Sequence, residues 1–374
     1  MSTYALPTNT KHLMKNPHAV TKVDFYQALS PLSMNIADST HHISKIAFIV
    51  TRIRLNNGTI GESYLLSFHY SPNAIAGALK DVKEHVIDYD VSQTGQFLRQ
   101  IESETEYFGH DGIHRWAMGA INIAMWDAWG KTLGQPVWKL WGSYHKRVPL
   151  YGSGGWLSYA MEELLDEVVK YKKRGFKAVK VKVGSSEPGR DLERLGKVRE
   201  ALGPDMHIMM DANQGMDYTS AKDLAEQAKR LKITWFEEPL PNSDFDGYVK
   251  LHQHTGMALA MGEREYNTVA LRSLLEHRAI DLWQPDILRL GGVEAWRASA
   301  ALAHAYHVPV LPHFYKEYDV PLLMTIPNAR GAESFDWVDP LITNPVRMED
   351  GWAYPNEESG WGFRFKDQYL TELG

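Results

Sequence analysis

Hydrophobic and polar positions divide the chain into two regions with different rhythms. Before residue 70 apolar and polar residues alternate as in strands: KIAFIVTRIRL is followed by Asn57-Gly58, a favoured hairpin turn, and then by TIGESYLLSF. The later stretch RWAMGAINIAMWDAWGK repeats apolar residues at helical spacing, and Gly134 and Pro136 mark its end. We therefore expect an α+β domain over residues 1–146, with residues 1–17 as an extension.

From residue 147 onward, short apolar runs alternate with amphipathic helical stretches. The runs are VPLYGSG, KAVKVKVG, HIMMDANQ, TWFEEP, MALAMGE, IDLWQPD, VPVLPH and GAESFDW. Strands with helical crossovers at this period predict a parallel (β/α) barrel of the TIM type over residues 147–339. A doubly wound sheet is the alternative, but no phosphate-binding glycine loop supports it. Residues 340–374 lose the period, and we expect them to return to the first domain, which caps the barrel.

Composition narrows the class of protein. The 374 residues carry a formal net charge of −6 and include no cysteine. Disulfides, thiolate metal sites and a cysteine nucleophile are therefore excluded, and the charge gives no reason to expect nucleic acid or an anionic membrane as a partner. Neither a signal-peptide pattern nor a long apolar run occurs. We expect a cytoplasmic protein that acts on a small molecule.

Acidic residues end three consecutive strands of the expected barrel, at the rim where such barrels build their active sites. Asp211, Glu237 and Glu263 follow one another at intervals of one βα unit. Three converging carboxylates stay ionised only around a cation, and ligands that are all oxygen favour a hard ion such as Mg²⁺. Each acid alone could equally cap a helix N-terminus. Three in register on successive strands favour the metal site.

Lys180 and Lys182 lie two residues apart in FKAVKVKVG, so a strand directs both ammonium groups to one face. The acids on the next strands would compensate for their burial. Because one ammonium lowers the pKa of another, we expect Lys180 to make Lys182 a usable neutral base. A solvated pair on an edge strand is the alternative, but valines flank both lysines and a closed barrel has no edge.

On the other side of the expected rim, His313 ends the seventh strand and Asp286 the sixth. A carboxylate on one imidazole nitrogen fixes the tautomer and raises the basicity of the other nitrogen. With Lys182 opposite, acid/base groups would flank a metal-bound substrate, which suits removal of a proton next to a carboxylate. Glu333, on the eighth strand, could donate a hydrogen bond to a substrate oxygen if its pKa were raised. Mg²⁺, Lys180 and a protonated Glu333 would then stabilise the enediolate.

These motifs resemble the mandelate racemase branch of the enolase superfamily, and most closely its acid-sugar dehydratases of the galactarate and L-talarate type. KVKVG is similar to the K-x-K strand of that branch; MDANQ, WFEEP and MGE are similar to its three metal-binding strands, and QPDILRLGG and LPHFYKE to its Asp–His strands. Enolase-superfamily sites use Lys or His bases together with Mg²⁺. The resemblance runs from about residue 20 to the end of the chain.

The resemblance implies a role for each candidate residue. Glu237 is preferred to Glu238 because the ligand in this motif is the first glutamate. The implied roles are Asp211, Glu237 and Glu263 as Mg²⁺ ligands, Lys182 and His313 as acid/base residues, Asp286 as the partner that orients His313, Glu333 as the electrophilic residue, and Lys180 and Asn213 near the substrate carboxylate.

The implied activity is a lyase reaction of carbohydrate catabolism, the Mg²⁺-dependent dehydration of an aldarate or aldonate to a 2-keto-3-deoxy acid. A racemase or epimerase is the main alternative, a cycloisomerase the next, and a non-catalytic metal-binding relative less favoured. A metal hydrolase would bring histidine ligands, which these strands lack. The family also suggests a homo-oligomer, often an octamer. In the family, the loop SMNIADSTHHIS folds over the barrel mouth and reads the substrate; here Asp38, His41 and His42 could contact substrate hydroxyls, with a solvated loop as the equal alternative. Arg289 is expected to lie behind the residues that contact substrate, and Arg264 and Tyr266 receive no role.

Overall fold

An antiparallel sheet forms the base of the first domain. The computed structural model describes residues 16–373, so most of the expected extension over residues 1–17 lies outside the described residues. Strands β1 (Val20–Ser30), β4 (Ile46–Leu55) and β5 (Ile60–Leu66) pair antiparallel in that order. The predicted hairpin between β4 and β5 is confirmed, and it turns at Gly58, whose φ of 86° suits glycine.

Three helices accompany this sheet: α2 (Pro72–Lys83), α3 (Thr94–Thr105) and α4 (Ile113–Thr132). The apolar face predicted for α4 is buried, with Ala117, Ile121 and Ala124 inaccessible to solvent. Gly61 of β5 lets helix and sheet approach closely, because a Cβ there would stand 2.3 Å from the carbonyl oxygen of Ala124. The predicted α+β character of this domain is confirmed.

The barrel strands follow one another in sequence order and pair in parallel. They are β6 (Val148–Gly154), β7 (Ala178–Lys182), β8 (His207–Asp211), β9 (Ile233–Glu237), β10 (Leu259–Met261) and β11 (Leu282–Trp283), and β12 (Ala332–Ser334) returns to pair with β6. The expected seventh strand is reduced to a bridge at Val310, which joins Trp283 to Ala329. Pro309 and Pro312 explain this shortening, because neither has an N–H to donate to a ladder.

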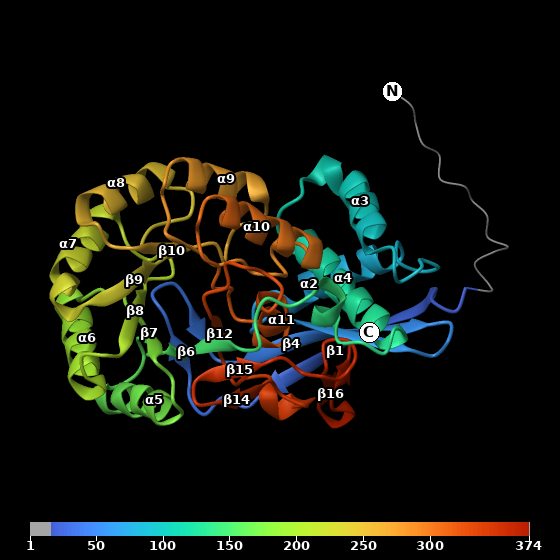
Figure 1. The fold of residues 1–374 in the computed structure, drawn as a ribbon, viewed down its shortest axis with the longest axis horizontal. Coiled ribbons are helices and arrows are strands. Elements are labelled where there is room, and N and C mark those ends of the chain that lie inside the picture. Colours follow the sequence, from blue (N-terminus) through green and yellow to red (C-terminus); the bar gives the residue numbers. More distant parts are fainter. Residues whose placement is uncertain (1–15, 374) are drawn as a thin grey trace.

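Helices alternate with these strands in the (β/α)₇β order, and Figure 1 shows α5 to α10 around the outside of the barrel. They are α5 (Met161–Lys173), α6 (Pro188–Leu202), α7 (Tyr218–Ala228), α8 (Phe245–Thr255), α9 (Thr268–Glu276), α10 (Val293–Ala305) and α11 (Lys316–Leu323). Among residues 16–373, no helix has both the length and the apolarity needed to cross a bilayer. The alternation of parallel strands and helices confirms the predicted fold class, a (β/α) barrel with an α+β first domain.

Apolar side chains from successive strands fill the barrel interior beneath the strand ends. The buried members of this cluster are Tyr151, Met209, Trp235, Ala260, Leu282 and Leu311. In β8 and β9 the cluster residue stands two positions before the strand-end acid, so alternation along the strand sends both side chains to the same face. The packed layer therefore supports the polar groups at the rim.

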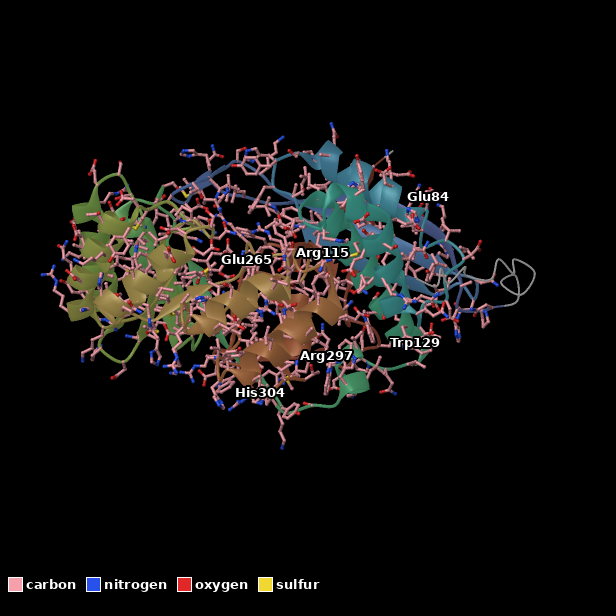
Figure 2. The ribbon with its side chains drawn as sticks, turned by 90° about the horizontal axis from the view of Figure 1, so that it is seen from above. Glu84, Arg115, Trp129, Glu265, Arg297 and His304 are labelled. Atoms are coloured by element: carbon pink, nitrogen blue, oxygen red, sulfur yellow. The ribbon has the colours of Figure 1, made fainter. Side chains whose placement is uncertain are left out.

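Helix α4 joins the first domain to the barrel, and Figure 2 labels Arg115 at this junction. The guanidinium Nε of Arg115 donates to the carbonyl of Leu290 at 2.9 Å. Asn122 accepts from the backbone N–H of Val293 at 3.0 Å and donates to Glu294 at 2.9 Å, so it caps α10 from the other domain. These contacts fix the first domain relative to the barrel strands.

The C-terminal segment contacts both domains. It contains β13 (Ile342–Thr343), β14 (Arg347–Glu349), β15 (Trp352–Tyr354), β16 (Arg364–Phe365) and β17 (Thr371–Glu372). Strand β15 pairs with β6 of the barrel, and β17 pairs with β1 of the first domain. Buried Glu62 accepts a hydrogen bond from the N–H of Phe365 at 3.0 Å. The predicted boundaries after residues 146 and 339 stay predictions.

Candidate active site

A cavity of about 560 Å³ lies between the carboxyl ends of the barrel strands and the first domain. Asp211 and Glu237 are buried and contact the two lysines of the cavity wall instead of lining it themselves. The other predicted site residues all line the cavity: Lys180, Lys182, Asn213, Glu263, Asp286, His313 and Glu333.

Register places the two lysines among the acids. Lys182 pairs with Asp211 across β7 and β8, and Asp211 pairs with Glu237 across β8 and β9. The Lys182 Nζ lies 2.6 Å from Asp211, while the Lys180 Nζ hydrogen-bonds Glu237 and lies 2.8 Å from Glu333 and 3.5 Å from Asp211. Each buried ammonium therefore has a carboxylate partner, which explains how one strand can bury both lysines.

The neighbouring charges change the pKa of Lys182 in the direction opposite to the one that we expected. Burial and Lys180 do lower the pKa of Lys182, but the carboxylates of Asp211, Asp38 and Glu263 together outweigh them and the pKa is raised. Burial raises the pKa of Glu237 to about 8, with a further contribution from Asp211. The ammonium groups outweigh burial at Asp211 and lower its pKa. Lys180 alone is thus not enough to make Lys182 a neutral base.

The three predicted metal ligands do not stand as a closed cluster. Within the described part of the chain, no three His, Asp or Glu side chains are grouped closely enough to hold a metal ion. Their chemistry nonetheless fits a hard divalent cation, because Asp211, Glu237 and Glu263 offer buried carboxylate oxygens. Asn213 adds an amide Oδ1 that is buried without a hydrogen-bond partner among residues 16–373. A bound cation would have to displace the lysine contacts of Asp211 and Glu237.

His313 is held in one orientation by Asp286. The His313 Nδ1 lies 2.8 Å from Asp286 Oδ2, and the other Asp286 oxygen accepts the backbone N–H groups of Leu288 and Arg289 at 2.8 and 3.0 Å. The His313 Nε2 lies 3.5 Å from Glu263. Although burial lowers the pKa of His313, Glu263 and Asp286 raise it to about 9. The imidazole is therefore ready to donate a proton from Nε2.

Glu333 does not meet the condition that we set for a hydrogen-bond donor. Burial alone would raise the pKa of its carboxyl, but Lys180 and His313 lower it to about 2. The carboxylate accepts the backbone N–H of Phe314 at 2.8 Å in addition to the ion pair with Lys180. In this arrangement Glu333 is an acceptor that holds Lys180 in place.

Backbone strain collects just beyond the strand ends. Asn213, Gln214, Glu238 and Phe314 have φ values of 42°, 66°, 37° and 69°, in the left-handed region that non-glycine residues rarely adopt. Such conformations cost on the order of 1 kcal/mol each and cluster at functional sites. Glu238 is buried, accepts from Gln214 at 2.9 Å and lies 3.3 Å from Arg264. This strain supports a functional site at the rim.

The loop SMNIADSTHHIS, which the resemblance places over the barrel mouth, reaches the cavity. It contains the hairpin of β2 (Ile36–Ala37) and β3 (His42–Ile43), and Asp38 and His41 from its turn line the cavity. The Thr40 hydroxyl donates to the carbonyl of Asn213 at 3.2 Å. The first domain thus contributes directly to the site.

Three further cavity residues lie on the barrel side; Arg264 and Tyr266 received no role from the sequence, which predicted that Arg289 lies behind the substrate contacts. Arg264 lies 3.7 Å from Glu263 and donates to the Asn213 carbonyl at 3.2 Å; Arg289 donates to the Glu263 carbonyl at 2.7 Å. Tyr266 lines the same wall. The signal available in the sequence was their position within a few residues of a strand-end acid, which is where barrel sites recruit residues.

Comparison with known proteins agrees with this geometry. Residues 19–142 match the model of the mandelate racemase/muconate lactonizing enzyme N-terminal domain, and residues 163–369 match the enolase C-terminal domain-like family. The L-talarate/galactarate dehydratase of Salmonella typhimurium is 28% identical over 98% of this chain and 94% of its own length. The 3,6-anhydro-alpha-L-galactonate cycloisomerase of Streptomyces coelicolor is 27% identical over 94% of this chain and 98% of its own.

The solved structures extend this likeness to three dimensions. A mutant L-talarate/galactarate dehydratase, liganded with Mg and L-glucarate, superposes with a TM-score of 0.90 at 26% identity, over 99% of this chain and 96% of its own. The two family models together span most of the described residues, one over the capping domain and one over the barrel. The chain belongs to the mandelate racemase branch of the enolase superfamily.

Proposed function

We propose that this protein is a Mg²⁺-dependent dehydratase of a sugar acid. The observation that carries the proposal is that Lys182, His313 and Glu263 line one cavity, with His313 held by Asp286 and with buried Asp211 and Glu237 directly behind the cavity lysines. Asp211, Glu237 and Glu263 would hold the ion. When bound, Mg²⁺ would supply Lewis-acid stabilisation of the negative charge that develops on the substrate carboxylate.

Lys182 and His313 are the two side chains that would transfer protons. Lys182 would become a base once Asp211 turns to the metal and no longer raises the pKa of the lysine; Lys182 or His313 would then take the proton from the carbon next to the carboxylate. Lys180 and Asn213 line the same cavity and would neutralise and orient that carboxylate. Protonated His313, its Nδ1 fixed by Asp286, then donates a proton to the departing β-hydroxyl, which leaves as water. Tautomerisation of the resulting enol gives a 2-keto-3-deoxy acid.

One relative supports this assignment because it is named a dehydratase, and a solved structure of a mutant L-talarate/galactarate dehydratase holds Mg and L-glucarate. A cycloisomerase is the second candidate, because another relative of nearly full coverage is named one. The same acid/base pair would also serve a racemase or epimerase, which returns a proton to the opposite face of the same carbon. Dehydration differs from racemisation in its 2-keto acid product and from cycloisomerisation in the loss of water.

A sugar-acid screen tests the proposal. We expect incubation of the protein and Mg²⁺ with aldonates and aldarates to give a 2-keto-3-deoxy acid, detected as its semicarbazone, and EDTA to stop the reaction until Mg²⁺ is restored. Solvent deuterium that enters recovered substrate, with no keto acid formed, would favour a racemase or epimerase instead. If a sugar-acid lactone or an anhydro sugar acid, added in a separate incubation, is converted into an isomer without loss of water, a cycloisomerase is favoured instead.

Asp286→Asn tests the orientation of His313. The amide can still accept the N–H groups of Leu288 and Arg289, but its NH₂ group would face His313 Nδ1 and impose the wrong tautomer. We expect kcat to fall about 100-fold or more, with the melting temperature nearly unchanged. Asp281→Asn is the matched control, because Asp281 forms a similar pair, at 3.2 Å, with the surface residue His252. Equal losses in both variants would contradict the assignment.

A further inference from the structure

Gln284 is a buried amide that lies behind the proposed metal ligand Glu237. Its Nε2 donates to the Oε2 of Glu237 at 2.6 Å. Gln284 directly follows β11 and Glu237 ends β9, so the hydrogen bond reaches past β10, the strand between them. Gln284 is not among the residues that line the cavity, and it would not contact a substrate there. Its side chain therefore acts on Glu237.

The two oxygens of the Glu237 carboxylate have different partners. Oε2 accepts from Gln284 and, more weakly, from the Trp235 Nε1 at 3.4 Å. Oε1 accepts from the ammonium group of Lys180, which lines the cavity. A cation that enters from the cavity and takes the place of this ammonium therefore meets Oε1, while the amide and the indole keep Oε2.

The orientation of the amide follows from the charge of its partner. An ionised carboxylate only accepts hydrogen bonds, so Gln284 has to turn its NH₂ group toward Glu237. Its own Oε1 is then buried without a hydrogen-bond partner among residues 16–373. An unpaired buried acceptor lowers stability. Gln284 thus holds Glu237 at a cost in stability, which indicates a role in the site.

Gln284 holds the carboxylate from a fixed backbone. Its N–H donates to the carbonyl of Met261 on β10 at 3.0 Å. The preceding residue, Trp283, is fully buried; its indole N–H donates to Ser299 of α10 at 3.1 Å, and its carbonyl accepts from the N–H of Leu311 at 2.9 Å. Because these bonds fix the end of β11 on both sides, the amide presents its NH₂ group to Glu237 at one place.

Divalent ions differ in how they use a carboxylate. Mg²⁺ requires short bonds in octahedral geometry, whereas the larger Ca²⁺ readily takes both oxygens of one carboxylate. As long as Gln284 holds Oε2, Glu237 offers an ion one oxygen only. This arrangement suits Mg²⁺ and withholds a second oxygen from Ca²⁺.

On the basis of the metal ligands named in the proposed function, we propose that Gln284 is a positioning residue that reserves one oxygen of Glu237 for the ion and so favours Mg²⁺ over Ca²⁺. It acts through the glutamate and contacts neither the ion nor the substrate. Without the amide, the carboxylate can rotate and bind with both oxygens, which lowers the affinity for Mg²⁺ and spares the affinity for Ca²⁺.

Metal binding to Gln284→Met tests the inference without turnover. Methionine keeps the length and nearly the volume of the side chain but has no N–H to donate. Mn²⁺ serves as a paramagnetic probe, whose free concentration is read by electron paramagnetic resonance, and Mg²⁺ or Ca²⁺ is titrated in to displace it. We expect the dissociation constant of Mg²⁺ to rise about tenfold or more. That of Ca²⁺ should rise less, so the preference for Mg²⁺ falls at least about threefold. A preference equal to that of the wild type would overturn the inference.

Two further variants accompany this one. Gln100→Met removes a similar pair on the surface, since the Gln100 Nε2 donates to Glu104 at 3.0 Å, and it should change neither affinity. Trp235→Phe removes the weaker donor to Oε2, and we expect it to lower the preference for Mg²⁺ in the same direction but by less. If Gln284→Met does not fold, Trp235→Phe decides, because an unchanged preference in that variant would refute the inference.

Glu237→Gln separates this inference from the proposed function. If Glu237→Gln loses Mg²⁺ while Gln284→Met keeps the wild-type preference, the ligand stands and the inference alone falls. If Gln284→Met loses the preference but the sugar-acid screen gives no product, the inference stands and the dehydratase assignment falls. If Glu237→Gln binds Mg²⁺ as tightly as the wild type, Glu237 is not a ligand, and the inference falls with that assignment.

Discussion

Replacing Lys182 by alanine is expected to lower kcat about 1,000-fold or more, because the loss removes a group that transfers a proton at the reacting carbon. The Lys182 ammonium contacts Asp211 at 2.6 Å, whereas Lys180 contacts Glu237 and Glu333. The variant therefore keeps the remaining ion pairs and all three proposed ligands. We expect calorimetry to show Mg²⁺ binding at least as tight as in the wild type.

Lys177→Ala provides the matched control, since Lys177 is an exposed lysine just before the same strand. Its kcat should match that of the wild type. Solvent exchange refines the result: deuterium that still enters the substrate in Lys182→Ala would identify His313 as the initiating base, and loss of exchange would identify Lys182. Turnover near the wild-type rate would remove Lys182 from the mechanism altogether.

The barrel could be predicted because its strands repeat with a regular period and end in polar residues. Strands β7, β8 and β9 combine buried apolar residues with a terminal Lys, Asp or Glu, and these positions were found correctly. The seventh strand was overestimated, since its apolar run VPVLPH forms only a bridge. Its prolines have no backbone N–H to donate to a neighbouring strand, which shortens the pairing. The prediction rested on the run of apolar residues and took no account of missing hydrogen-bond donors.

The contacts at the rim could be predicted only in part. A strand-end position shows that Asp211 and Lys182 face the same region, but it does not show which carboxylate pairs with which ammonium. The pKa of Lys182 depends on that pairing, so an expectation based on Lys180 alone had the wrong direction. The same holds for Glu333, whose carboxylate is kept ionised by Lys180. Charges in a buried network depend on three-dimensional distances that no local pattern contains.

The residues that the first domain contributes to the cavity were predicted only for the loop with Asp38 and His41, for a different reason. Residues from loops and helix ends, such as Asp38, Tyr70 and Ile113, have no periodicity to place them. They meet the barrel because α4 docks against α10 through Asn122 and Glu294, a contact between residues far apart in the sequence. The barrel side of the cavity was therefore predictable from strand ends, whereas most of the residues that the first domain adds to the cavity were not. Oligomeric state and cellular location likewise stay predictions.

A second large effect is expected on stability, from replacing Lys316 by alanine. Lys316 is fully buried, and its Nζ lies 2.7 Å from Asp339, 3.2 Å from Asp336 and 3.8 Å from Glu317. It also donates to the carbonyl of Phe335 at 2.6 Å, so this one ammonium ties the start of α11 to the segment after β12. Burial raises the pKa of Glu317 to about 7 even with Lys316 beside it.

Without that ammonium, Lys316→Ala leaves the buried carboxyl groups of Glu317 and Asp339 uncompensated, and breaking such a network costs about 3–5 kcal/mol. The free energy of unfolding, measured by urea denaturation, should fall by that amount. Lys197→Ala, which breaks the exposed pair with Glu200, should change it by less than about 0.5 kcal/mol. Because α11 begins three residues after His313 and the tied segment follows Glu333, we also expect activity to be lost at a lower urea concentration in Lys316→Ala than in wild type. A loss of stability no greater than that of the Lys197 control would show that the acids around Lys316 are neutral and do not depend on it.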